Sequence, residues 1–362
     1  MNDAIKLKTN ESKQIFFLDF IKAISIVSAV SYHSVFVPAS TYSDSFLILE
    51  ILFAPLRFCV PMFLAINFLL SELSFDSKPN VETWNSLKKR LSRLTIPCIT
   101  WFSIAIILKL LVGNPMSTLI YQILTGEIFT GGYYLLIVLQ LTLLYFCFRG
   151  QFKKPIVLAI LIAAQIVIFL GIKLALSSSC WMDIITLLKL LRRPLLFYWF
   201  AYIPLGIFCH KNLSWLVSQS RCLSWKVKAF MLGGLTILLV AEYTQLSILT
   251  NGSIPPLEYL MTSCLLSIPI FFLCFASVTY QQLGTNLGEI TLLFSKYSLG
   301  IFCINGILSQ VFLSLGSQWF YNAEFSFAEI LIVKILGWIF LFFVSLKISI
   351  LLEKIGLKML VC

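Results

Sequence analysis

The chain has 362 residues, of which 59% are hydrophobic and only 12% are charged, and its mean hydropathy is +0.94. Soluble domains average about 45–50% apolar and about 25% charged residues, so this composition excludes an ordinary soluble protein and indicates an integral membrane protein. The formal net charge of +11 falls in short loops between apolar runs, without zinc-finger spacing or a basic-aromatic strip. This placement favours membrane lipid over nucleic acid as the partner.

Apolar runs near the length of a membrane span recur along the chain, since a spanning helix needs about 20 apolar residues. We therefore predict an all-α, polytopic transmembrane helical bundle of about ten spans. An N-terminal tail (1–14) precedes the transmembrane domain (15–352), and a C-terminal tail (353–362) follows it. The predicted spans are 15–37, 46–70, 95–112, 133–148, 155–175, 195–209, 229–249, 258–279, 292–315 and 328–352.

The first predicted span carries Asp19, Lys22 and His33 among apolar residues. Lys22 and His33 are eleven residues apart, which on one helix places them on the same face about 16 Å apart. Asp19 lies one turn from Lys22 and could pair with it, which would lower the cost of burying both charges. Neutral histidine is a good base near neutral pH, so His33 is the leading candidate for proton transfer. The structural alternative is a polar contact between helices, with Lys22 extending towards the inner surface.

The second predicted span contains Arg57 four residues before Pro61. Proline frees a backbone carbonyl, and arginine is a permanent cation, so a kink beside a charge is predicted here. Such a kink often borders a cavity, in which Arg57 could stabilise negative charge. A kink that serves only packing is the alternative.

Before the third predicted span, Arg90 and Arg93 lie one helical turn apart. This spacing suits the bidentate binding of a phosphate or pyrophosphate. Basic residues ahead of a span are also what cytoplasmic topology requires, so the pattern alone leaves both interpretations open.

Loops rich in lysine and arginine alternate along the chain with loops that lack them. Basic loops lie on the cytoplasmic side, so this alternation predicts that both termini are cytoplasmic. One predicted outer segment, 173–194, disagrees because it carries Lys173, Lys189, Arg192 and Arg193. Within it, Asp183, Thr186 and Lys189 recur every three residues, which predicts an amphipathic helix on the membrane surface or re-entering it. A miscounted span is the alternative.

Later spans hold further polar side chains that could line the same cavity as His33, although the sequence does not say which do. They are Glu242, Gln245, Glu258, Asn305, Gln310 and Lys334. The ten cysteines occur singly and never as Cys-x-x-Cys, and only Cys180 falls in a predicted outer loop. Neither a disulfide framework nor a metal site is therefore expected.

Several motifs together resemble the membrane acyltransferase 3 family, in order from about residue 15 to 350. The family's opening motif, a basic residue followed by histidine, is similar to Phe17-Leu-Asp-Phe-Ile-Lys22 with His33. Val60-Pro-Met-Phe-Leu is similar to its second-span block, and Arg90-Leu-Ser-Arg93 before Pro97 to its cytoplasmic Arg-x-x-Arg. The later blocks are Tyr133-Tyr-Leu-Leu, Phe200-Ala-Tyr-Ile-Pro-Leu-Gly206 and Tyr297-Ser-Leu-Gly-Ile301.

The resemblance implies a ten-span enzyme that moves an acyl group, commonly acetyl, from cytoplasmic acyl-coenzyme A to a hydroxyl. The acceptor would be a carbohydrate or a lipid-linked glycan, as in polysaccharide O-acetylation, and the location the bacterial plasma (inner) membrane. His33 would serve as base or acyl relay, and Lys22 would stand where the family has arginine. Arg90 and Arg93 would hold the coenzyme A phosphates, and no metal is expected.

The chain departs from the family pattern at three places. Ile66-Asn67 stands where the family has Ser-Gly, Tyr134 where it often has tryptophan, and Asn305 where it has a late histidine. Two alternatives to an acyltransferase remain. The intramembrane charges and the kinked second span also suit a transporter or exporter of a glycan or small molecule. The departures at Ile66-Asn67 and Asn305 suit a non-catalytic assembly subunit.

Overall fold

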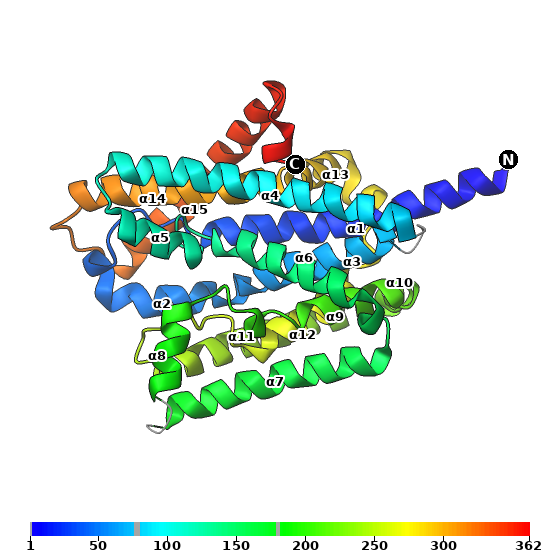
Figure 1. The fold of residues 1–362 in the computed structure, drawn as a ribbon, viewed down its shortest axis with the longest axis horizontal. Coiled ribbons are helices and arrows are strands. Elements are labelled where there is room, and N and C mark those ends of the chain that lie inside the picture. Colours follow the sequence, from blue (N-terminus) through cyan, green and yellow to red (C-terminus); the bar gives the residue numbers. More distant parts are fainter. Residues whose placement is uncertain (1, 76–79, 179–181) are drawn as a thin grey trace.

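The computed structural model describes residues 2–75, 80–178 and 182–362, and within these ranges it contains helices but no strand. Most helices run along the long axis of the molecule, with α1 in the middle of the bundle (Figure 1). The α-helices are α1 (Asn2–Ser31), α2 (Ser43–Phe53), α3 (Cys59–Phe75), α4 (Asn80–Leu111), α5 (Met116–Leu124), α6 (Tyr133–Phe152), α7 (Pro155–Ser177), α8 (Met182–Leu191), α9 (Tyr202–Lys211), α10 (Leu213–Cys222), α11 (Trp225–Leu249), α12 (Thr262–Phe275), α13 (Tyr280–Lys296), α14 (Ser298–Trp319) and α15 (Phe327–Lys354). Shorter 3-10 helices are η1 (Ala39–Tyr42), η2 (Ala54–Phe58), η4 (Leu196–Tyr198) and η5 (Lys358–Leu360).

Each of the ten predicted spans contains a helix of the structure. Seven segments in the described part of the chain are long and apolar enough to cross a membrane, and an eighth is formed if α12 and α13 count as one bent span. The other predicted spans correspond to α1 and to η4 with α9. The all-helical membrane bundle is thus confirmed, whereas the count of ten spans and the side of each terminus stay predictions.

Helix α1 packs against α3, α12, α13, α14 and α15, which explains its apolar sequence. Phe17, Ile21, Ile26 and Val30 are completely buried there. A helix that contacts neighbours on every side buries apolar residues around its whole circumference, so it shows no single apolar face.

The backbone after α1 runs closely past two glycines, one on α14 and one on α15. A Cβ atom at Gly316 would overlap the Phe36 carbonyl oxygen, and one at Gly337 would overlap that of Ser34. Only glycine allows the backbones to approach this closely. The two glycines therefore fix the path of the chain just beyond His33.

Helix α8 lies crosswise to the long helices (Figure 1), within the segment whose basic residues disagreed with the predicted topology. The predicted helix is thus present from Met182 to Leu191. Cys180 lies outside the described residues, as does the side chain of Asp183. The structure contains no membrane, so the predicted surface location of α8 stays a prediction.

Candidate active site

His33 lies in the turn directly after α1, because serines at every third position end that helix. Ser31 Oγ donates a hydrogen bond to Ser28 O at 2.7 Å, and Ser34 Oγ donates one to Ser31 O at 2.8 Å. These side chains satisfy carbonyls that the last helical turn leaves open. The predicted helix over 15–37 is therefore wrong at its C-terminal end, and His33 is not part of the helix that carries the lysine.

The His33 side chain lines a cavity of about 400 Å³, which we call the His33 cavity. Among the described residues, no hydrogen bond occupies either ring nitrogen. Burial, and then the positive charges of Lys334, Arg193 and Arg57, lower the pKa of the imidazole well below its usual value. His33 is therefore neutral at physiological pH, with a lone pair available to accept a proton.

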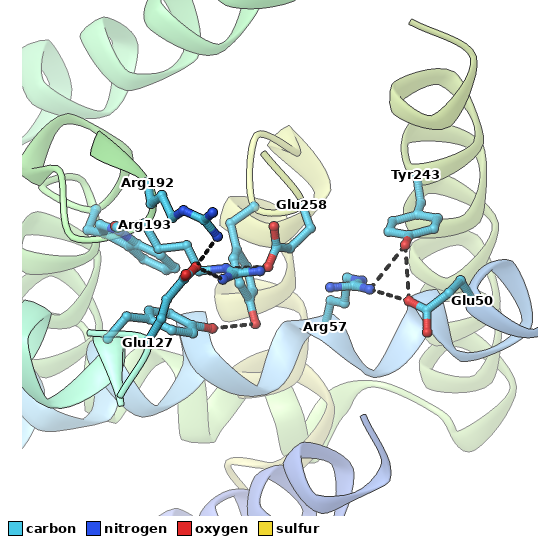
Figure 2. Close-up of polar contacts among 10 residues, drawn as sticks. Glu50, Arg57, Glu127, Arg192, Arg193, Tyr243 and Glu258 are labelled. Carbon is cyan, nitrogen blue, oxygen red and sulfur yellow. Dashed lines mark hydrogen bonds and ion pairs between the residues drawn. The ribbon is translucent and has the colours of Figure 1, made fainter. Parts of the chain in front are cut away.

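Arg57 also lines the His33 cavity, as the second predicted span suggested. Its Nη2 donates hydrogen bonds to Glu50 Oε2 at 2.8 Å and to Tyr243 OH at 3.1 Å (Figure 2). The Nε atom of Arg57 is buried without a partner. The position of the kink was predicted wrongly: Pro61 lies in the first turn of α3, where a missing N–H costs nothing. The break is η2, which contains Arg57 itself.

A second ion-paired group on the cavity wall joins Arg193 to two glutamates. Its Nε donates to Glu258 Oε1 at 2.6 Å and its Nη1 to Glu127 Oε1 at 3.1 Å. Arg192 Nη1 donates to the same Glu127 oxygen at 2.6 Å. Figure 2 shows this group beside that of Arg57. Segments far apart in the sequence thus meet around one cavity.

These ion pairs account for three of the four basic residues that disagreed with the predicted topology, all except Lys189. Arg192 and Arg193 pair with Glu127 and Glu258, and Lys173 pairs with Glu242 at 2.9 Å. Cations held by carboxylates inside the fold carry no topological signal. Sequence analysis did not identify Arg193 as a site residue. The only sequence signal for it was the unexpected presence of basic residues in the predicted outer segment 173–194.

Aromatic residues complete the wall of the His33 cavity. Tyr133 OH donates to Tyr259 OH at 3.1 Å, and the Arg193 guanidinium lies 5.1 Å from the Tyr133 ring centroid. Of the later polar residues, Glu258 and Gln310 line the cavity, whereas Glu242, Gln245, Asn305 and Lys334 do not. The remaining lining residues are Ala29, Tyr32, Glu50, Cys59, Val60, Gly126, Glu127, Phe129, Thr130, Gly131, Pro255 and Phe302.

A separate polar group lies where α1, α3 and α4 meet, and we call it the Arg90 cluster (Lys22, Asn67, Arg90 and Arg93). Arg90 Nη2 donates to both the backbone O and the Oδ1 of Asn67, each at 2.7 Å. Lys22 is close enough to Arg90 for their charges to interact. Within the described ranges, no carboxylate lies within 4.0 Å of these cations.

Asp19 and Lys22 lie close enough for their charges to attract, as their spacing predicted, but no contact within 4.0 Å joins these two described residues. The Asp19 Oδ1 accepts a hydrogen bond of 2.6 Å from Ser295 Oγ, which joins α1 to α13. Asp19 is thus part of the helix packing, and no contact places it at the His33 cavity.

Tyr134 contacts aromatic rings of both the cavity wall and α3. It lies 5.2 Å from Phe302, which lines the His33 cavity, and 6.2 Å from Phe63 of α3, measured between ring centroids. Tyr134 is also close enough to Arg90 for an electrostatic interaction. Tyr134 thus interacts both with the wall of the His33 cavity and with the Arg90 cluster.

The described cysteines are all free, and no group of three His, Cys, Asp or Glu side chains in the described ranges could hold a metal ion. Asn305 is completely buried, and neither polar atom of its amide has a partner.

Comparison with known proteins places the chain in a family but gives no individual relative. Residues 15–354 match the acyltransferase domain model of the acyltransferase 3 family, which covers nearly the whole chain. No curated protein and no solved structure matches the chain significantly. The chain therefore belongs to the membrane acyltransferase 3 family and is a multi-pass membrane acyltransferase.

Proposed function

We propose that the protein transfers an acyl group, most simply acetyl, from acyl-coenzyme A to a hydroxyl of a carbohydrate or lipid-linked glycan. The observation that carries this proposal is the neutral His33 imidazole on the wall of a polar cavity that also contains Arg57. A base and a cation that share one cavity supply the two requirements of acyl transfer to a hydroxyl.

The transfer follows from these two side chains. His33 accepts the proton of the acceptor hydroxyl as its oxygen attacks the thioester carbonyl carbon. Arg57 stabilises the negative charge that develops on the carbonyl oxygen. The carbon–sulfur bond then breaks, and the proton passes from His33 to the departing sulfur, which leaves an ester and a free thiol. An acyl group carried by His33 as a relay gives the same products.

The Arg90 cluster suits the phosphates of acyl-coenzyme A. Arg90 and Lys22 are neighbouring cations without a carboxylate partner, and Arg93 lies one turn further along α4. Asn67 fixes the Arg90 guanidinium through two hydrogen bonds, which pre-orients it for a phosphate. In this arrangement acyl-coenzyme A enters from the cytoplasm. Its thioester passes the rings of Tyr134, Phe302 and Phe63 to reach His33.

The lining of the His33 cavity supports a carbohydrate acceptor. Ionised carboxylates accept hydrogen bonds from hydroxyl groups, and the flat rings of Tyr133 and Tyr259 suit the faces of a sugar. We further propose that the cavity opens on the far side of a bacterial plasma (inner) membrane, where such glycans are modified.

The test is release of free thiol from acetyl-coenzyme A by the purified full-length protein. We expect His33→Ala to lower turnover about 10²- to 10⁴-fold, the usual contribution of a general base. His210→Ala is the matched control, because the other histidine of the chain lies at the end of α9, away from the cavity. It should retain turnover.

Other outcomes contradict the proposal. Movement of a ligand across vesicles without thiol release indicates a transporter. Unchanged glycan acylation in cells that carry His33→Ala, together with loss on deleting the gene, indicates a non-catalytic subunit.

A further inference from the structure

Glu258 presents an unused hydrogen-bond acceptor at the His33 cavity. Its side chain is buried, and its Oε1 accepts the Arg193 hydrogen bond at 2.6 Å. Its second oxygen, Oε2, is buried and has no partner. An unpaired buried acceptor costs free energy in a folded protein, so such an atom at a cavity wall requires a partner such as water or a bound ligand.

The surroundings of Glu258 hold the carboxylate in one orientation. Two further hydrogen bonds fix Arg193. Its Nη1 donates to Glu127 Oε1, and the backbone oxygen of Arg193 accepts a 2.6 Å hydrogen bond from Trp199 Nε1. Burial alone would raise the pKa of Glu258, but the charges of Arg193 and Arg57 outweigh it and lower the pKa below its usual value. The carboxylate is therefore ionised, and the free oxygen can only accept hydrogen bonds.

The charges around the cavity restrict which donor can bind to Glu258. Arg57 and Arg193 line the same cavity together with Glu50, Glu127 and Glu258, and both arginines are ion-paired with these glutamates, so the lining favours a neutral donor. A hydroxyl is neutral and can donate to Glu258 Oε2. Its own oxygen can accept from a donor such as Arg57 Nε, which also lacks a partner. A hydroxyl thus fits both unused groups.

We propose that Glu258 binds a second hydroxyl of the acceptor, in the same cavity as the hydroxyl that His33 deprotonates, so that the enzyme selects polyhydroxy acceptors over simple alcohols. The inference rests on the proposed function and goes beyond it, because it assigns acceptor choice to one carboxylate. Arg193 is the positioning residue that holds this carboxylate in place.

The test compares ethylene glycol with ethanol, which differ by one hydroxyl, as acceptors for the purified full-length protein with acetyl-coenzyme A. Mass spectrometry measures the ester formed, and thiol release measures total turnover. We expect the wild-type protein to prefer ethylene glycol by about tenfold or more, the usual effect of a hydrogen bond to a charged group. In Glu258→Gln the preference for ethylene glycol over ethanol should disappear.

Glu242→Gln is the matched control, because Glu242 is also an ion-paired carboxylate but lies outside the cavity. It should keep the preference for ethylene glycol. If Glu258→Gln cannot be recovered from membranes, Glu258→Asp replaces it. This variant keeps the charge but withdraws the oxygens by one methylene, and it should also lose the preference.

The two proposals fail in different ways. Equal use of both alcohols by the wild-type protein, or an unchanged preference in the Glu258 variants, overturns the role of Glu258 while acyl transfer stands. Absence of any thiol release by the wild-type protein overturns the proposed function itself.

Discussion

At the scale of single residues, the lowered pKa of His33 has a direct consequence for the pH dependence of turnover. Protonation removes the base, and a lowered pKa moves protonation to lower pH. An imidazole of ordinary pKa loses about nine-tenths of its neutral form between about pH 8 and about pH 5.5. We therefore expect acetyl-coenzyme A turnover at saturating donor to stay level across this range.

A half-maximal loss of turnover near the ordinary value of 6.5 would contradict this expectation. Lys334→Met provides a second test, because the charge of Lys334 is the largest cause of the lowered His33 pKa after burial. Removing that charge should move the acidic fall in turnover to higher pH. The Lys334 ammonium lies 4.4 Å from the Phe53 ring centroid and outside the cavity, so the donor site is left intact.

Individual site residues could be predicted from the sequence only where one segment carries the signal. His33 and Arg57 are ionisable residues within apolar runs, and the structure brings both to one cavity. Glu258 was one of several candidates, and Arg193 was noticed only as a topological exception. Their pairing joins residues 65 apart in the sequence. No local pattern encodes such a contact.

At the scale of helices, the contact between α3 and α4 allows Asn67 to test the proposed donor site. This residue stands where the family has glycine, and the structure shows that its side chain holds Arg90. We expect Arg90→Gln to raise the KM for acetyl-coenzyme A about tenfold or more, because it removes a charged hydrogen bond to phosphate. Asn67→Ala should raise KM by a smaller factor, since the backbone acceptor for Arg90 remains.

Arg93→Gln is the matched comparison for Arg90, since it removes a charge one turn away on the same helix. The Arg93 side chain is exposed, so water and salt screen its charge and the effect on KM should be smaller than for Arg90. Steady-state rates at varied acetyl-coenzyme A measure both. An unchanged KM in Arg90→Gln would leave the arginines as topological signals only.

Helix ends were less predictable than helices, and α1 shows why. The apolar run continues to Val37, so hydropathy extends the helix past Ser31. Serine hydroxyls and the close approach of the chain to Gly316 and Gly337 end it earlier. Hydropathy records burial, and the segment after α1 is also partly buried, with Ser34 and Val37 almost fully covered.

At the scale of the whole molecule, the number of crossings depends on whether α12 and α13 cross the membrane once. They are bent by 118° at their junction. Helix α12 has 14 residues, a rise of about 21 Å. Thr262, at the start of α12, donates a hydrogen bond to Glu242 near the end of α11. Lys228, near the start of α11, donates one to Ser277, just after α12. Helix α12 therefore runs antiparallel to α11. We therefore expect α12 to cross with α11.

Two native cysteines test this crossing. Cys222 precedes α11, and Cys362 follows α15, and both are exposed. If α12 crosses, four crossings separate them and they lie on the same, cytoplasmic, side. A membrane-impermeant maleimide should then label both in inside-out vesicles and neither in intact cells. Asn251→Cys, between α11 and α12, should show the opposite pattern. Labelling of Cys222 and Cys362 from opposite sides would show that α12 and α13 re-enter the membrane without crossing it.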